Sequence, residues 1–224
     1  MRGLAAGLAT PLLAGCSGPL STLDPAGGAA SSVATLWWVM LAGATALLML
    51  VLVLLAWSFM RSAGSVRPEV WLIGGGLVLP GVVLPPLLIY GLWGGEQLLA
   101  RPGAAALTVE VHAERWRWTF RYPDAEGGPR TSTDVLHIPA GRPIDISVTS
   151  GDVIHSFWVP RLAGKIDAIP GHTNVLRLSA DRPGIYHGTC AEFCGTGHTA
   201  MTMRVEVHAA EDYAARVSEM EPVP

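Results

Sequence analysis

The sequence predicts a membrane-anchored protein in which an N-terminal hairpin of two transmembrane helices precedes an all-β domain, a sandwich or barrel. Two long runs without charge lie in the first half of the chain, and alternating apolar and polar residues fill the second half. Half of the 224 residues are hydrophobic, only 15% are charged, and the mean hydropathy is +0.38. This composition argues against a disordered chain and against a fully soluble one.

Charge and cysteine content exclude two further classes of protein. The net charge is -3 and the pI is near 6.1, so the chain lacks the basic character of a nucleic-acid-binding protein. Three cysteines are too few for a disulfide scaffold.

The two helices are predicted from residues 33–57 and 70–95, which are uncharged and mostly apolar. Each run is longer than the roughly 20 residues that a helix needs to cross a bilayer. Pro80 and the pair Pro85 and Pro86 predict a kink in the second helix. Tryptophans near the ends of both runs are typical of residues at the level of lipid headgroups.

The connection between the helices carries Arg61 and Arg67, which favours the cytoplasmic side for it and the outer side for both ends of the hairpin. The N-terminus agrees, because a short apolar stretch leads to Leu13-Ala14-Gly15-Cys16, which resembles the lipobox of bacterial lipoproteins. The resemblance implies cleavage before Cys16 and lipidation of that cysteine; the alternative is an uncleaved leader. We therefore expect five parts: a signal peptide (1–15), an irregular outer segment (16–31), the hairpin (32–101), the β domain (102–212) and a short helix or loose tail (213–224).

Strands of the β domain are predicted from alternation of apolar and polar residues with a period of two. Ile144, Ile146 and Val148 alternate with polar residues, and Met201 begins a second alternating run. Pro- and Gly-containing turns separate the expected strands, which cover residues 107–111, 115–122, 135–138, 143–149, 175–178 and 201–207. Several short strands with such turns predict a small sandwich or barrel.

Metal-ligating residue types gather in residues 184–201. Cys190, Cys194, His198 and Met201 lie within twelve residues, and His155 could supply a second imidazole. Thiols, imidazoles and a thioether form a soft ligand set that suits copper. A zinc site and a disulfide between the two cysteines stay open as alternatives. A covalent c-type haem is excluded, because the chain has no Cys-x-x-Cys-His sequence.

The pattern Cys-x-Glu-x-Cys-x-x-x-His-x-x-Met resembles the binuclear copper A motif of subunit II of haem-copper cytochrome c oxidases. The resemblance extends to the two helices, a tryptophan-rich segment, Asp-Val-x-His-Ser and Lys-x-Asp-Ala-Ile-Pro-Gly, all in family order. It implies a cupredoxin-like β domain and six ligands to two copper ions: His155, Cys190, Glu192, Cys194, His198 and Met201.

The resemblance also implies a role for each ligand. The two cysteines would bridge both coppers, the two histidines would be terminal ligands, and Met201 would be a weak axial ligand. Glu192 would use its backbone carbonyl for copper and its side chain for a magnesium ion shared with subunit I. Trp116 would be the residue at which electrons enter, with plain packing of Trp116 and Trp118 as the alternative.

Charges around Trp116 depart from the family pattern. Arg115, Arg117 and Arg121 stand where the family more often carries neutral or acidic residues, although cytochrome c is normally a basic partner. An acidic patch could still come from six carboxylates: Glu110, Glu114, Asp124, Glu126, Asp134 and Asp152. Lys165 and Asp167 match a polar segment at the interface with subunit I. Glu69 resembles the carboxylate at the mouth of the family's K proton pathway, but an ordinary interfacial role is the favoured interpretation.

The resemblance implies subunit II of a proton-pumping bacterial cytochrome c oxidase in the inner membrane, with the copper domain on the periplasmic side. Such a subunit accepts electrons from a cytochrome c and passes them to subunit I, which reduces oxygen; subunit III and the lipid bilayer are further partners. Three alternatives are a quinol oxidase subunit II, the copper A subunit of a nitric oxide reductase, and a free-standing copper-carrying lipoprotein.

Overall fold

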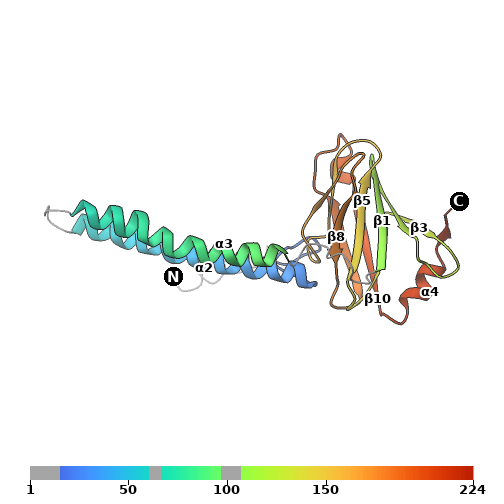
Figure 1. Cartoon of the computed structure of the whole chain (residues 1–224), viewed down its shortest axis with the longest axis horizontal. Helices are drawn as coiled ribbons and strands as arrows, with labels where there is room; N and C mark the ends of the chain where they lie inside the picture. The colour runs from blue at the N-terminus through green and yellow to red at the C-terminus, as the bar shows by residue number, and fades with distance from the viewer. Residues whose placement is uncertain (1–15, 61–66, 97–106, 224) are drawn as a thin grey trace, which may run out of the picture. The chain divides into compact units, whose positions relative to one another are not determined.

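The computed structural model describes residues 16–60, 67–96 and 107–223. The expected signal peptide (1–15), Arg61 and the region 97–106 lie outside the described residues. The chain divides into two compact units, the helical hairpin Val33–Gln97 and a unit that combines Met1–Ser32 with Leu98–Pro224. We describe each unit by itself (Figure 1).

The hairpin consists of α2 (Gly28–Met60), the π-helical segment η2 (Val70–Val78) and α3 (Leu79–Glu96). Gly28–Met60 and Val70–Gly95 are long and apolar enough to cross a membrane, and no residue of their most apolar windows is buried. A core helix of a soluble protein would be mostly buried, so these exposed apolar surfaces favour contact with lipid. The two predicted helices are therefore confirmed as helices of spanning length.

The second helix changes type along its length. Three consecutive glycines, Gly74–Gly76, lie within the π-helical segment, which gives way to α-helix at Leu79. Pro85 and Pro86 lie inside α3. Such irregular turns are rare in helices and weaken regular backbone hydrogen bonding. The expected kink at these residues stays a prediction.

The β domain is a sandwich of two sheets (Figure 1). One sheet has the order β11-β3-β2-β1-β5-β8, formed by β1 (Leu107–Glu114), β2 (Arg117–Tyr122), β3 (Arg130–Thr133), β5 (Ile144–Ser150), β8 (Asn174–Leu178) and β11 (Glu221–Pro222). The other has the order β4-β10-β9-β6-β7, formed by β4 (Val135–Pro139), β6 (His155–Trp158), β7 (Ile166–Ala168), β9 (Gly184–Cys190) and β10 (Thr202–His208). The predicted all-β class is confirmed.

The core lies between the two sheets and follows the predicted alternation. Ile144, Ile146 and Val148 of β5 are fully buried, and their polar neighbours on the strand are not. Trp118 and Phe120 of β2 are also fully buried. From the sequence, plain packing of Trp118 is the alternative to a role in electron entry. For Trp118 the packing interpretation holds.

One predicted strand is interrupted at Arg115 and Trp116. The alternation predicts a strand over 115–122, but β1 continues to Glu114 and β2 begins only at Arg117. Arg115 and Trp116 form the turn between these two antiparallel strands. Trp116 is therefore at one end of the sandwich, outside the core.

The segment before α2 is attached to the β domain. The Arg161 side chain bonds the Asp24 carbonyl at 2.7 Å and the Asp24 carboxylate at 2.8 Å, and the Ala26 N–H donates to the Arg161 carbonyl at 2.7 Å. Ala26 is buried. The helix begins at Gly28 rather than at residue 32, because Ala30 donates to the Leu162 carbonyl and so fixes the first turn against the domain. The helix thus takes in residues 28–31 of the segment that was expected to be irregular.

The C-terminal segment contains the short helix α4 (Tyr213–Ser218), and a short helix was one of the two structures predicted for it. After α4, β11 pairs with β3 through Glu221 and Thr131. Val217 of α4 is buried against the core, so this segment is packed rather than loose.

Candidate metal centre

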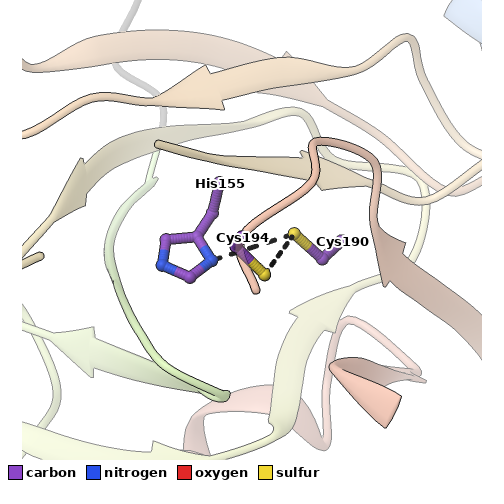
Figure 2. A group of neighbouring side chains, drawn as sticks. All are labelled: His155, Cys190 and Cys194. Atoms are coloured by element: carbon purple, nitrogen blue, oxygen red, sulfur yellow. Dashed lines mark hydrogen bonds between the residues drawn. The ribbon is translucent and has the colours of Figure 1, made fainter. Parts of the chain in front are cut away.

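Three predicted ligands converge at one end of the second sheet. His155 is the first residue of β6, Cys190 is the last residue of β9, and Cys194 follows in the loop after β9. The Sγ atoms of the two cysteines are 3.9 Å apart, and Nδ1 of His155 is 3.8 Å from Sγ of Cys190 (Figure 2). The described cysteines form no disulfide, so the disulfide alternative is not supported.

The remaining predicted ligands complete the group on the side of Cys194. Its Sγ atom is 3.7 Å from Nδ1 of His198 and 3.9 Å from Sδ of Met201. On the other side, the Cys190 thiol donates to the backbone carbonyl of Glu192 at 3.3 Å. All six predicted ligands therefore lie around the pair of sulfur atoms.

The local fold explains why distant residues meet here. The Cys190 N–H donates to the Met201 carbonyl at 2.9 Å, which closes the ligand loop into a compact turn between β9 and β10. The short helix η3 (His198–Ala200) then separates His198 from Met201 by one helical turn. β6 pairs with β9 through Phe157 and Cys190, and this pairing brings His155 beside the loop.

The centre is largely closed to water. His155 and Met201 are fully buried, and the two cysteines are 3% and 4% exposed. Burial, together with the neighbouring Cys190, raises the pKa of the Cys194 thiol to about 11. A metal ion must therefore displace thiol protons when it binds, as metals do at other cysteine sites.

Asp152 orients the His155 ring. The Nε2–H of His155 donates to Oδ1 of Asp152 at 2.8 Å, which leaves Nδ1 as the free acceptor beside the sulfur of Cys190. Oδ2 accepts bonds from the backbone N–H and the side chain of Arg115, both at 2.9 Å. Burial alone would raise the pKa of Asp152, but the hydrogen bonds from His155 and Arg115 outweigh it and lower the pKa far below its usual range. From the sequence, Asp152 is predicted only as part of the segment Asp-Val-x-His-Ser and of a possible acidic patch.

Trp116 lies against the ligand loop. A β-carbon at Gly197 would come within 2.3 Å of the Trp116 ring, and one at Gly195 would come within 3.4 Å, so the indole covers the loop between Cys194 and His198. The side chain is 42% exposed. Trp116 thus connects the surface with the backbone that carries two of the ligands.

The donor set fits copper. Two thiols, two imidazoles and a thioether are soft or borderline ligands, and a buried methionine among them is uncommon at structural zinc sites. The backbone carbonyl is a harder donor and would add only a weak ligand. Nitrogen, oxygen and thioether donors lie on both sides of the two adjacent sulfur atoms. This arrangement suits two metal ions better than one. The residues present could hold a binuclear copper centre.

Comparison with known proteins agrees with this geometry. The family model described as cytochrome c oxidase subunit II, periplasmic domain, matches residues 130–208. The subunit 2 of cytochrome c oxidase from Alkalihalophilus pseudofirmus is 37% identical over 118 residues, which are 53% of this chain and 34% of the relative. The protein of the same name from Zea mays is 30% identical over 178 residues, 69% of this chain and 66% of the relative. The chain belongs to the cytochrome c oxidase subunit II family.

A solved structure is similar to part of the chain. The periplasmic domain of subunit II of cytochrome oxidase from Bradyrhizobium japonicum is 29% identical, covers 51% of this chain and 92% of that domain, and gives a TM-score of 0.47. The chain spans about a third of the length of the bacterial relative described above and about two thirds of the plant relative. Membership in the subunit II family, with its cupredoxin-like domain, confirms the resemblance seen in the sequence.

The predicted magnesium ligand is not brought into a metal-binding group of the described residues. The Glu192 side chain is exposed, and the proposed magnesium ligand has no partner carboxylate or histidine grouped with it in the described part of the chain. Lys165 and Asp167 form an ion pair at 3.2 Å. The Asp-x-x-His spacing of Asp152 and His155 was the signal that could have revealed the positioning role of Asp152.

Proposed function

We propose that this chain is the electron-accepting subunit of a haem-copper oxidase, with a binuclear copper A centre held by His155, Cys190, Glu192, Cys194, His198 and Met201. The observation that carries the proposal is the convergence of all six donors around two sulfur atoms 3.9 Å apart. The bound copper pair would take up and release one electron at a time.

The chain's own residues would make that electron transfer fast. Asp152 holds His155, and strand pairing holds Cys190, so the donors are fixed before metal binds. Burial excludes water from the ligands. A rigid, dry ligand set changes little in geometry when charge arrives or leaves, which lowers the reorganisation that electron transfer requires.

Trp116 is the proposed point of electron entry from a periplasmic cytochrome c. Its indole is partly exposed and packs on the loop between two ligands. Phe193, 76% exposed, adds a second aromatic ring beside His198, with ring centres 5.8 Å apart. These two rings offer an apolar contact area close to the centre, as docking sites for protein partners often do.

The three arginines near Trp116 do not make this face strongly basic. Arg115 pairs with Asp152 at 2.9 Å, Arg117 with Glu114 at 3.6 Å, and Arg121 with Glu110 at 3.2 Å. Each positive charge thus has a carboxylate beside it. Docking of the donor would depend mainly on the apolar rings, with modest electrostatic steering.

The proposed partners follow from the family. Subunit I would receive the electrons and reduce oxygen with coupled proton pumping, Glu192 would contribute to a magnesium ion shared with it, and subunit III would complete the complex. The hairpin would anchor the chain in the bacterial inner membrane. Subunit II of a quinol oxidase is disfavoured, because that family lacks the copper ligands that are complete here.

The test is copper counting with electron paramagnetic resonance on the full chain, purified in detergent and reconstituted with copper. We expect two copper ions per chain that share one unpaired electron, seen as hyperfine splitting from two equivalent copper nuclei. Cys194→Ser should abolish this signal, because it removes one bridging thiolate. A single copper, a preference for zinc, or a mixed-valence signal that survives in Cys194→Ser would contradict the proposal.

A further inference from the structure

A second group of metal-ligating side chains lies on the outer face of the same sheet. His137 comes from β4, and Glu206 and His208 come from β10. The two strands are parallel neighbours, and Glu206 lies directly opposite His137. Because side chains on one face repeat every second residue, Glu206 and His208 point to the same side as His137. The intervening Ile138 and Val207 are buried in the core.

The three side chains are close enough to share one ligand. Nδ1 of His137 is 2.9 Å from Nε2 of His208 and 3.7 Å from Oε2 of Glu206. The imidazole planes are 6° apart with ring centres at 5.2 Å. The facing nitrogens are much closer than the ring centres, so the rings meet edge to edge through a hydrogen bond.

A pocket opens beside these groups. Its volume is about 350 Å³, and it is lined by the three side chains together with Arg216, Glu219 and Met220. Glu206 also accepts a bond from Arg204 at 2.8 Å, and Arg216 lies 3.4 Å from Glu219. The pocket therefore has room for water next to the imidazoles, and its flanking charges are balanced.

We propose that His137, Glu206 and His208 form a second metal site, which binds a divalent first-row transition ion of the zinc type. Two imidazoles and one carboxylate are ordinary ligands for such ions. Donor atoms that share one zinc ion, each at about 2.0–2.2 Å from it, lie roughly 3.0–3.5 Å apart. The separations of 2.9 and 3.7 Å bracket this range.

Binding requires one local change. In the imidazole that donates the hydrogen bond between the two rings, the proton must move to the other ring nitrogen. Both rings must also turn so that their lone pairs converge on the ion. His208 is the last residue of β10 and is not buried, so its ring can turn without disturbing the core. Water from the pocket would complete the coordination.

This site is separate from the thiolate centre. Met201 immediately precedes β10 and His208 ends it, so the two sites lie at opposite ends of one strand, roughly 20 Å apart at about 3.3 Å per residue. The inference does not depend on the proposed function, because it uses none of the same side chains.

The test is a zinc titration by isothermal calorimetry on the full chain in detergent, with any affinity tag removed. The background carries Cys16→Ser, Cys190→Ser and Cys194→Ser, so that no cysteine of the chain remains to bind zinc. We expect one zinc ion per chain. His208→Asn should weaken zinc binding at least about tenfold, because even the loss of groups that only support a ligand costs about 10- to 100-fold.

His187→Asn is the matched control, since His187 is an exposed residue of the neighbouring strand β9, opposite Arg204, and lies outside the group. It should bind zinc as the parent does. Equal zinc affinity in His208→Asn and His187→Asn, or no zinc binding to the background chain, would overturn the proposal. If thermal unfolding shows that His208→Asn is unfolded, Glu206→Gln decides in its place, with weaker binding supporting the site and unchanged binding overturning it.

Discussion

At the scale of single residues, Asp152 shows how one carboxylate can organise a metal ligand. It fixes the ring of His155 through Nε2 and is itself held by Arg115. We expect Asp152→Asn to lower copper affinity by about 10- to 100-fold, because the loss of such a supporting partner has this effect at other metal sites. Competition titration with a copper chelator, on the full chain in detergent, measures it.

The control for this change is Asp124→Asn, which alters an exposed carboxylate outside the centre. It should leave copper affinity unchanged. Equal affinities in the two variants would mean that His155 keeps its orientation through packing alone.

Met201 offers a second prediction at this scale. Met201→Leu conserves volume in a fully buried position, so the free energy of unfolding should fall by less than about 1.5 kcal/mol. Copper should still bind, but the reduction potential and visible spectrum should change, because the weak axial thioether tunes such centres. Spectroelectrochemistry of the copper-loaded chain measures both.

Met203→Leu is the matched control, since Met203 is the next buried methionine and belongs to β10. Its spectrum and potential should equal those of the parent. If Met201→Leu also leaves both unchanged, Met201 is a core residue and not a ligand.

The ligands themselves could be predicted from sequence because most of them lie within one short segment. Cys190, Cys194, His198 and Met201 needed only their spacing and chemistry, and these also named His155 as a possible second imidazole. Asp152 lies three residues before His155 in the sequence, but only the fold shows that its carboxylate bonds the ring. The pairing of His137 with His208 could not be predicted, because it depends on β4 and β10 becoming neighbours, and strand order is a property of the folded sandwich.

At the scale of elements, strand periodicity predicted the core but not every strand. The alternating runs of β5 and β10 stood out because one face of each is buried. The short strands β3, β6, β7 and β11 were missed, since two to four residues do not establish a period of two. β9 was missed as well, because Gly184 and Gly188 interrupt its pattern of side chains. Yet β6 supplies His155, so the least predictable element carries a ligand.

The attachment of residues before α2 was also beyond prediction, because it depends on contacts between residues far apart in the sequence. Gly27 illustrates its tightness: a β-carbon there would lie 2.3 Å from the Ser179 carbonyl oxygen and 2.7 Å from that of Leu162. Both obstacles are backbone atoms, which cannot turn aside as a side chain can. Only glycine fits at this position without displacing the segment.

We therefore expect Gly27→Ala to destabilise the chain by about 1–3 kcal/mol, the usual cost of overpacking, and to expose residues 16–32 to protease. Chemical denaturation and limited proteolysis with mass spectrometry test this. Gly28→Ala is the matched control, because nothing lies within 4 Å of its added carbon. Equal protease resistance in the two variants would mean that the segment is not held by this contact.

At the scale of the whole molecule, the distribution of charged residues along the sequence follows the division of the chain into a helical hairpin and a β domain. The two apolar spans of the hairpin carry no charge, whereas the β domain pairs many of its charged groups with one another. Arginines at 61 and 67 stand at the connection between the two apolar spans. The positive-inside rule predicts that this connection faces the cytoplasm and that the β domain lies on the outer side.

This orientation predicts the outcome of cysteine labelling in intact cells with a thiol reagent that does not cross membranes. Ala214→Cys, on an exposed position of α4, should react from outside, because it belongs to the β domain. Ser65→Cys, which lies between the two arginines in the sequence, should react only after the membrane is made permeable. The parent chain gives the background from Cys16, since Cys190 and Cys194 are buried. Labelling of Ser65→Cys but not of Ala214→Cys in intact cells would reverse the orientation and place the metal centre on the side away from a periplasmic donor.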